Sequence, residues 1–197
     1  QVDPLFVIDL SDPTNPKISG ELQMPGFSNY LHPVDETHVL GIGSENSIIK
    51  VSMYNVSDPT APYEQSKFIL DDFKYSWSSA QYDHKAVLFD LEKNLLVIPI
   101  SGYGEIYNGI YWESTSVSGA LVLYVSVEGG IHMRGIITHE KGNYNSIEYV
   151  WRSLYIGGNL YTISNSIIKA SSLVDLSEIS SLIYKENDYY RYIMYAL

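Results

Sequence analysis

Apolar positions along this chain alternate with polar ones or gather in blocks of four to six residues rich in Ile, Val and Tyr. Such blocks are typical of short β-strands, and no stretch reads as a good amphipathic helix. Val7–Pro16 returns as Met53–Pro62, at an offset of 46 residues. Each copy ends its alternating pattern at Ser-Asp-Pro, where Asp accepts from the backbone and Pro fixes φ for a turn. The repeat therefore predicts a strand, a tight turn and a second strand in both places.

Further matches in the sequence extend this unit to four strands. A four-stranded sheet cannot bury both of its faces alone, so units of this size, spaced by some 45 to 70 residues, favour the stacked blades of a β-propeller. The matching segments are Tyr30–His32 with Val39–Ile42, Tyr82–His84 with Leu95–Ile98, more loosely Tyr149–Trp151 with Leu160–Ile163, and Ser47–Lys50 with Ser166–Lys169.

The chain is therefore predicted to be an all-β propeller fragment of four-stranded antiparallel blades, with about three complete blades and partial blades at the ends. The expected parts are a partial blade at 1–25, blades at 26–71, 72–138 and 139–186, and the start of a further blade at 187–197. We letter the strands of a blade A to D outward from the axis, and expect strands C and D of the first, partial blade at 5–10 and 17–23. Strands A to D are expected at 30–35, 38–43, 48–56 and 63–70 in the next blade, and at 83–89, 95–100, 119–127 and 131–137 in the one after it. In the last complete blade they are expected at 149–156, 159–164, 167–174 and 178–184.

Five segments carry a resemblance to a known family. They are Asp3–Pro16, Pro25–Pro33, Tyr82–Ala86 with Leu95–Pro99, and Arg152–Ile156. With these segments the chain resembles secreted or surface-anchored prokaryotic proteins, largely archaeal, that have a C-terminal β-propeller distantly related to WD repeats. The resemblance implies a propeller fold and an extracellular or cell-surface location. It implies no activity and no catalytic residue, because the family has no established one.

Charge and cysteine content narrow the classes of partner. The 197 residues include 23 Asp and Glu against 12 Lys and Arg, a net charge of −11. This acidity disfavours nucleic acids and anionic lipid head groups. No apolar run approaches the roughly 20 residues of a membrane span, so no membrane insertion is expected in this fragment. Cysteine is absent, which is compatible with either redox environment. Because the chain starts without Met and inside a predicted strand, we expect a fragment whose incomplete end blades allow self-association.

Two long connections are the candidate binding surface. Residues 71–81 and 101–118 are expected to be loops on one face of the propeller, and both combine aromatic rings with carboxylates. Such rings provide flat apolar platforms for a sugar ring, a peptide or a cationic group, while the carboxylates accept hydrogen bonds. The alternative is that the rings fold inward and cover the core. The candidate binding residues are Phe73, Tyr75, Trp77, Tyr103, Tyr107, Tyr111 and Trp112, with Asp71, Asp72, Glu105 and Glu113 at the rim.

Two histidines occupy one repeat position near the expected channel mouth. His32 and His84 lie at the start of predicted inner strands, with Asp35 and Asp83 nearby. Converging imidazoles can ligate a metal or act as an acid and base. The third copy has Trp151-Arg152 at this place, however, so we expect both histidines to hydrogen-bond protein groups. No metal ligand set, catalytic residue or cofactor is assigned.

The function favoured by the sequence is that of a non-catalytic binding or scaffold module for a protein or a surface polymer. The alternative is a channel-mouth enzyme similar to quinoprotein dehydrogenases, with a metal or cofactor near His32 and His84. Only the analogy of fold supports this alternative.

Overall fold

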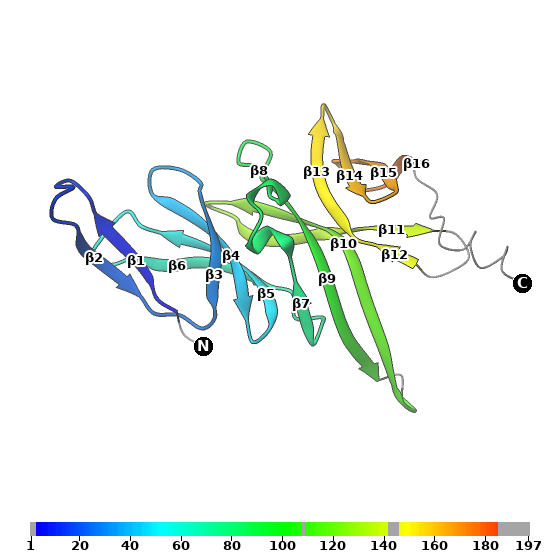
Figure 1. Cartoon of the computed structure of the whole chain (residues 1–197), viewed down its shortest axis with the longest axis horizontal. Helices are drawn as coiled ribbons and strands as arrows, with labels where there is room; N and C mark the ends of the chain where they lie inside the picture. Colours follow the sequence, from blue (N-terminus) through cyan, green and yellow to red (C-terminus); the bar gives the residue numbers. More distant parts are fainter. Residues whose placement is uncertain (1–2, 108, 142–145, 185–197) are drawn as a thin grey trace, which may run out of the picture.

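The computed structural model of this chain describes residues 3–107, 109–141 and 146–184. They form sixteen β-strands and two short 3-10 turns, and these ranges contain no α-helix. All strand pairs are antiparallel, and the four sheets follow one another in chain order across Figure 1. The predicted all-β fold of four-stranded antiparallel sheets is confirmed.

The first sheet has two strands, β1 (Leu5–Asp9) and β2 (Lys17–Leu22), and we call it the partial blade. The turn between β1 and β2 has the same side-chain hydrogen bonds as the turn between β5 and β6. Asp12 accepts from the backbone N–H and the hydroxyl of Thr14, and Asp58 does the same for Thr60. The expected equivalence of the two Ser-Asp-Pro turns is thus confirmed, and it identifies β1 and β2 as outer strands like β5 and β6.

Two sheets are regular four-stranded blades with their strands in sequence order. We call β3–β6 the second blade and β13–β16 the fourth blade. The strands of the second blade are β3 (Phe27–Pro33), β4 (His38–Glu45), β5 (Ile48–Asn55) and β6 (Tyr63–Ile69). Those of the fourth are β13 (Val150–Ile156), β14 (Asn159–Ser164), β15 (Ile167–Ser172) and β16 (Glu178–Ile183).

The sheet between them, the third blade, has a divided inner strand. Its outer strands are β9 (Leu95–Tyr107), β10 (Trp112–Ser126), β11 (Gly130–Lys141) and the short β12 (Ser146–Glu148). Both β7 (Tyr75–Trp77) and β8 (Leu88–Asp90) pair with β9. The expected inner strand at 83–89 is therefore wrong. Only its end is extended, and two 3-10 turns, η1 (Ser79–Gln81) and η2 (His84–Ala86), precede it.

The chemistry of proline explains this division. Residues 98–100 of β9 stand opposite the inserted residues 78–87, because Trp77 pairs with Ser101 and Leu88 with Val97. Pro99 lies in this stretch and has no N–H to donate to an inner strand. Its carbonyl accepts instead from the hydroxyl of Ser78. The inner strand therefore leaves the sheet opposite Pro99, which has no backbone N–H to donate to it.

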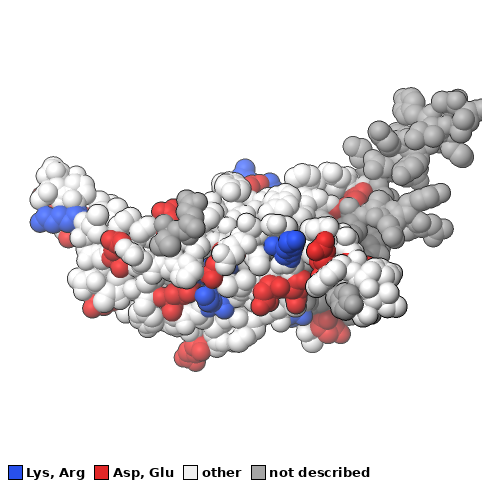
Figure 2. All heavy atoms as spheres, turned by 90° about the horizontal axis from the view of Figure 1, so that it is seen from below, with Lys and Arg blue, Asp and Glu red and all other residues white. Residues whose placement is uncertain are grey.

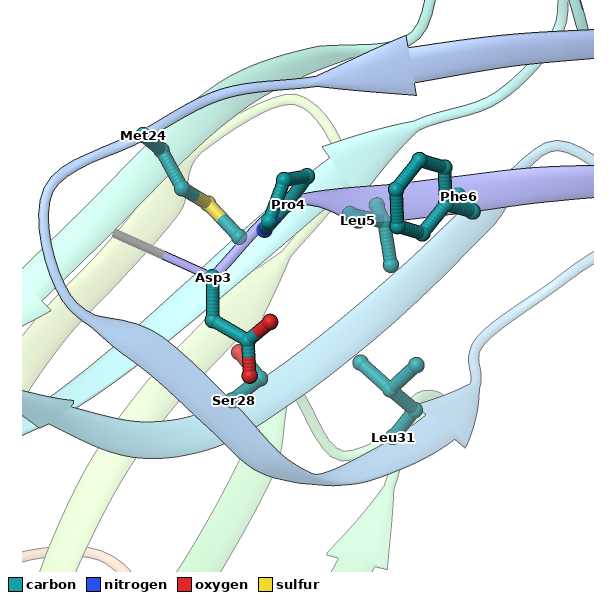
Figure 3. A pocket seen from close by; sticks show the side chains of 7 residues that line it. All are labelled: Asp3, Pro4, Leu5, Phe6, Met24, Ser28 and Leu31. Atoms are coloured by element: carbon teal, nitrogen blue, oxygen red, sulfur yellow. The ribbon is translucent and has the colours of Figure 1, made fainter. Parts of the chain in front are cut away.

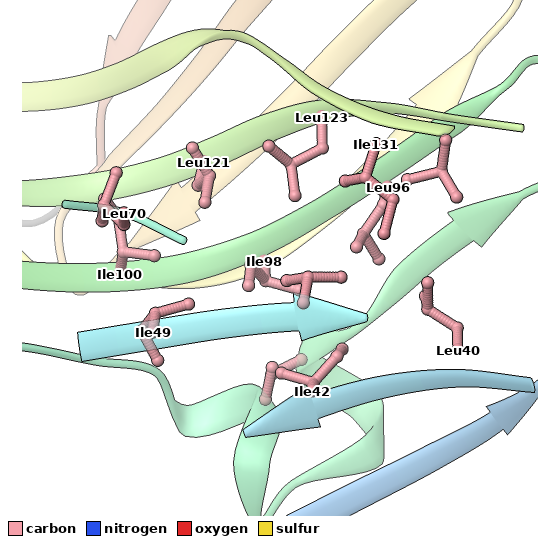
Figure 4. Close-up of a cluster of buried hydrophobic side chains, with 14 of the residues drawn as sticks. Leu40, Ile42, Ile49, Leu70, Leu96, Ile98, Ile100, Leu121, Leu123 and Ile131 are labelled. Carbon is pink, nitrogen blue, oxygen red and sulfur yellow. The ribbon is translucent and has the colours of Figure 1, made fainter. Parts of the chain in front are cut away.

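The two faces of β9 and β10 pack against different blades. Leu96, Ile98 and Leu121 point toward the second blade, where they meet Leu40 and Ile49 in one buried cluster (Figure 4). Residues of the other parity, such as Leu95, Val97 and Val122, pack against Val150 and Leu160 of the fourth blade. The stacking of blades thus follows directly from the period-two alternation of a strand.

A buried histidine lies between the third and fourth blades. His139 of β11 is fully buried, and its Nε2 lies 2.8 Å from Oγ1 of Thr162 on β14. Burial, and after it the positive charge of Lys169, lowers the pKa of His139 from 6.5 to about 4, against the opposing effects of Glu148 and Glu178. The folded protein therefore holds this side chain neutral.

We expect the free energy of unfolding to decrease as the pH falls from about 6.5 to about 4. Over this range the unfolded chain binds a proton at His139 that the folded chain does not, so protonation favours unfolding. The difference in pKa corresponds to a loss of about 3 kcal/mol. Urea unfolding at a series of pH values measures it. His139→Gln keeps a polar group beside Thr162 but does not titrate, so an equal loss in this variant would contradict the assignment.

Candidate functional site

The hairpin of β9 and β10 extends well beyond the blade. Residues 101–118 were expected to be a loop, and this expectation is wrong: the two strands pair without interruption from Leu95 with Tyr124 to Tyr107 with Trp112. β7 adds a third strand to the extension, with Tyr75 opposite Tyr103. Ladder hydrogen bonds therefore order this segment. The structure does bring the two predicted segments side by side (Figure 1).

One face of this extension is aromatic and exposed. Because cross-strand partners share a face, the register places Tyr75, Trp77, Tyr103 and Trp112 together, and we call this set the aromatic face. The aromatic face is on the same side of the sheet as Leu95 and Val97, the residues of β9 that pack against the fourth blade. Tyr75 and Trp77 are each 52% exposed and Trp112 is 67% exposed. The extension carries the aromatic face past the edge of the fourth blade, so nothing in that blade covers it fully.

Phe73 does not belong to this face. A Cβ placed on Gly102 would lie 2.8 Å from Cγ of Phe73, so the Phe73 ring covers the opposite side of β9. There it packs with Val117 against the buried cluster between the second and third blades. For this residue the alternative in which aromatic rings cover the core is the one observed. Glycine at position 102 allows the close approach because it has no side chain.

The other predicted residues of the hairpin are distributed as follows. Tyr111, at the turn, is 59% exposed. Tyr107 is paired through its backbone with Trp112, but its side chain lies outside the described part of the structure. Of the predicted rim, Glu105 shares the parity of the aromatic face and lies 3.9 Å from the ammonium of Lys74. Glu113 has the opposite parity, as its pairing with Ile106 shows.

Two residues that the sequence did not assign to the site adjoin it. The rings of Trp77 and Tyr149 stack at 5.2 Å with an interplanar angle of 9°, and Trp151 meets Tyr149 edge-on at 4.9 Å. The hydroxyl of Tyr149 accepts from the N–H of Ser79, and the indole N–H of Trp151 donates to Asn165. These partners hold the rings in place. The sequence shows that Tyr149 and Trp151 are aromatic residues at the start of the fourth blade. It does not show that they lie beside Trp77, because this depends on the stacking of blades.

The inserted residues 78–87 connect the inner strands on either side of the third blade. Gln81 donates to Asn29 of β3, and Asp83 forms an ion pair with Arg152 of β13 at 2.7 Å. A backbone N–H of η2 and the guanidinium of Arg152 lower the pKa of Asp83, so this carboxylate stays charged. Tyr82, beside this pair, is largely exposed.

The two histidines do not occupy equivalent positions. His32 of β3 pairs with Leu40 of β4. In the third blade, Leu96 corresponds to Leu40 in the sequence repeat, and its partner on the inner strand is Phe89. Phe89 therefore takes the place that was predicted for His84, and the predicted superposition is wrong. The reason is the insertion, which displaces His84 into the exposed turn η2.

His32 itself is held by protein groups. Its Nδ1 lies 2.9 Å from the hydroxyl of Tyr30, and its ring meets Phe89 edge-on at 5.1 Å. Desolvation by burial lowers the pKa of His32. Within the described ranges, no three or more His, Asp or Glu residues gather as a metal-binding group.

The surface of the molecule has two further features. A cavity of about 190 Å³ lies between β1 and β3. Apolar side chains such as Phe6, Met24 and Leu31 line most of it, and Asp3 and Ser28 line its polar side (Figure 3). Figure 2 shows acidic and basic side chains interspersed over one face of the molecule. No helix in the part of the chain that the structure describes is long and apolar enough to cross a membrane.

Comparison with known proteins agrees with this architecture. The chain is 44% identical over 108 residues to an uncharacterized protein of Archaeoglobus fulgidus and 38% identical over 108 residues to one of Methanocaldococcus jannaschii. These matches cover 55% and 54% of the chain but only 17% of each relative. The sequence model of the beta propeller domain matches residues 1–176. The chain therefore belongs to the beta propeller domain family.

Proposed function

We propose that this propeller is a non-catalytic binding module whose ligand lies on the aromatic face. The observation that carries the proposal is the pairing of β7 with the extended part of β9, which holds half-exposed Tyr75 and Trp77 beside Tyr103. Large aromatic rings on a rigid sheet lose little conformational freedom on binding, so they favour tight contact with a partner. A contiguous exposed apolar patch of this kind is typical of an interaction site.

The proposed ligand is a protein or a polymer of the cell surface, and the proposed location of the domain is extracellular. Support comes from the resemblance to secreted and surface-anchored archaeal proteins and from the acidic composition, which disfavours nucleic acid. Protease accessibility of the domain on intact cells tests the location. The alternative of a channel-mouth enzyme rests on the analogy of fold alone, and His32 on β3 and His84 in the exposed turn η2 do not occupy equivalent positions.

Replacing Trp77 and Trp112 together with Ala is expected to weaken binding of the parent protein to isolated cell envelopes of its source by at least about tenfold. Each substitution removes a large ring from the aromatic face, and residues of this type contribute most to affinity at interfaces. Sedimentation with envelopes at a series of protein concentrations measures this. Tyr63→Ala is the matched control, because Tyr63 is 50% exposed on the distant strand β6. Unchanged binding of a folded Trp77→Ala/Trp112→Ala variant would overturn the proposal.

A further inference from the structure

The surroundings of the aromatic face point to one class of ligand. Trp77 lies in a corner between the extended hairpin and the start of the fourth blade. One side of its indole stacks on Tyr149, and the side chain remains 52% exposed. Tyr149 is fixed in turn by Trp151 and by the N–H of Ser79. The corner therefore presents a ring that is oriented before any ligand arrives.

A column of hydroxyl groups runs beside the rings. Ser114, Ser116 and Ser118 of β10 have the parity of the aromatic face, since they pair with Glu105, Tyr103 and Ser101. Ser114 lies within hydrogen-bond distance of the Tyr103 hydroxyl, at 3.2 Å. Ser114 and Ser116 are exposed. Tyr103 on β9 thus lies next to hydroxyl groups on β10, and the rings of β7 lie on the same sheet face on the other side of β9.

Two pairs of opposite charges lie near this surface. Glu105 lies near Lys74, at 3.9 Å, and the Lys74 ammonium also lies 5.9 Å from the centre of the Tyr75 ring. Asp83 and Arg152 neutralise each other at the end of the corner. The whole chain carries −11, so a polyanion is repelled. A ligand that matches rings, hydroxyl groups and paired charges is itself uncharged and rich in hydroxyl groups.

We infer that the corner formed by Trp77, Tyr149 and the serine column binds a neutral polysaccharide; this inference rests on the binding function proposed above. Sugar rings present an apolar C–H face and hydroxyl edges. The C–H face stacks on Trp77 and Tyr75, while the hydroxyl edges exchange hydrogen bonds with Ser114 and Ser116. Tyr149 is a positioning residue, because it orients Trp77 from the side away from the ligand.

The test uses isolated envelopes whose sugars or proteins have been destroyed selectively. Periodate cleaves the vicinal diols of sugars, and a broad-specificity protease removes protein. We expect periodate treatment to reduce binding of the parent protein at least tenfold and protease treatment to change it less than twofold. Raising the salt concentration from 0.1 to 0.5 M is expected to change binding less than twofold, because a neutral ligand offers no charge to screen.

Variants separate this inference from the general binding function. Trp77→Ala is expected to lose at least tenfold in binding. Tyr149→Ala is expected to lose a smaller factor and to shift the tryptophan fluorescence of the free protein. Loss of binding after protease but not after periodate would overturn the polysaccharide and leave a protein-binding module. Binding that salt abolishes would overturn the neutral ligand. Failure of the wild-type protein to bind untreated envelopes would overturn the binding function itself.

Discussion

Replacing Lys50 with Met is expected to lower the free energy of unfolding by about 3 to 5 kcal/mol, the range typical for loss of one partner from a buried ion pair. Lys50 lies on β5 and is 2% exposed. Its ammonium is 2.8 Å from Glu64, 3.2 Å from Glu45 and 2.9 Å from the carbonyl of Pro25. Met fills a similar volume but leaves Glu64 without its cation and Glu45 with only Lys67, whose ammonium lies 3.6 Å from it. Urea unfolding of wild type and variant measures the difference.

The pKa of Lys50 reflects the same environment. Burial by itself lowers this pKa, but the hydrogen bonds and charge of Glu64, together with Glu45, raise it above its usual value. The ammonium therefore remains charged, and its loss is the loss of an ion rather than of a neutral amine. We expect Glu64→Gln in the Lys50→Met background to recover part of the stability, because it removes the carboxylate that has lost its cation.

The sequence repeat supplies a matched control for this prediction. Lys169 occupies the position of Lys50 in the fourth blade and makes the same kinds of contact, to Glu178 at 2.9 Å and to the carbonyl of Thr138 at 2.9 Å. Its side chain is 18% exposed and that of Glu178 is 47% exposed. Exposed pairs contribute about 1 kcal/mol or less. Lys169→Met should therefore cost clearly less than Lys50→Met, and equal losses would show that burial does not set the effect.

Replacing Leu121 with Ala is expected to lower the free energy of unfolding by about 2 to 5 kcal/mol. Leu121 is fully buried on β10, in the cluster that joins the second and third blades (Figure 4). The surrounding strands are held by their ladders and cannot close the cavity, so apolar contacts are lost as well as burial. Thermal and urea unfolding measure the loss.

An exposed leucine provides the comparison. Leu182 on β16 is 59% exposed, so Leu182→Ala in this chain is expected to change the free energy of unfolding by less than about 0.5 kcal/mol. A loss at Leu121 as small as that at Leu182 would show that the second and third blades do not share a packed core. The pair of variants therefore tests the stacking of blades and not only the stability of one sheet.

Local chemistry explains what the sequence predicted correctly. The Ser-Asp-Pro turns depend on a side chain and a backbone N–H two residues apart, and both copies adopt the same geometry. The repeated Ser47–Lys50 and Ser166–Lys169 segments likewise place their lysines in equivalent contacts. Strand alternation and turn chemistry act over a few residues, so they can be recognised in one chain without its neighbours.

Contacts between blades decided what the sequence predicted wrongly. Residues 101–118 were expected to be a loop, but pairing with β7 and within the hairpin extends the sheet through them. His84 matches His32 in the sequence, yet the insertion beside Pro99 puts Phe89 in its place. A match between short sequence segments does not reveal an insertion in a strand, because the register depends on hydrogen bonds to a strand that is distant in the sequence.

The sequence by itself determined that this protein is a series of antiparallel blades with aromatic residues between them. The tertiary structure decided which rings remain exposed. Phe73 packs against the core and Trp77 is half exposed, although they are four residues apart, because they lie on opposite faces of the sheet and the start of the fourth blade covers Trp77 only in part. Tyr149 reaches Trp77 only because the third and fourth blades stack. The period of a strand fixes its two faces, but the neighbouring sheet decides which face meets solvent.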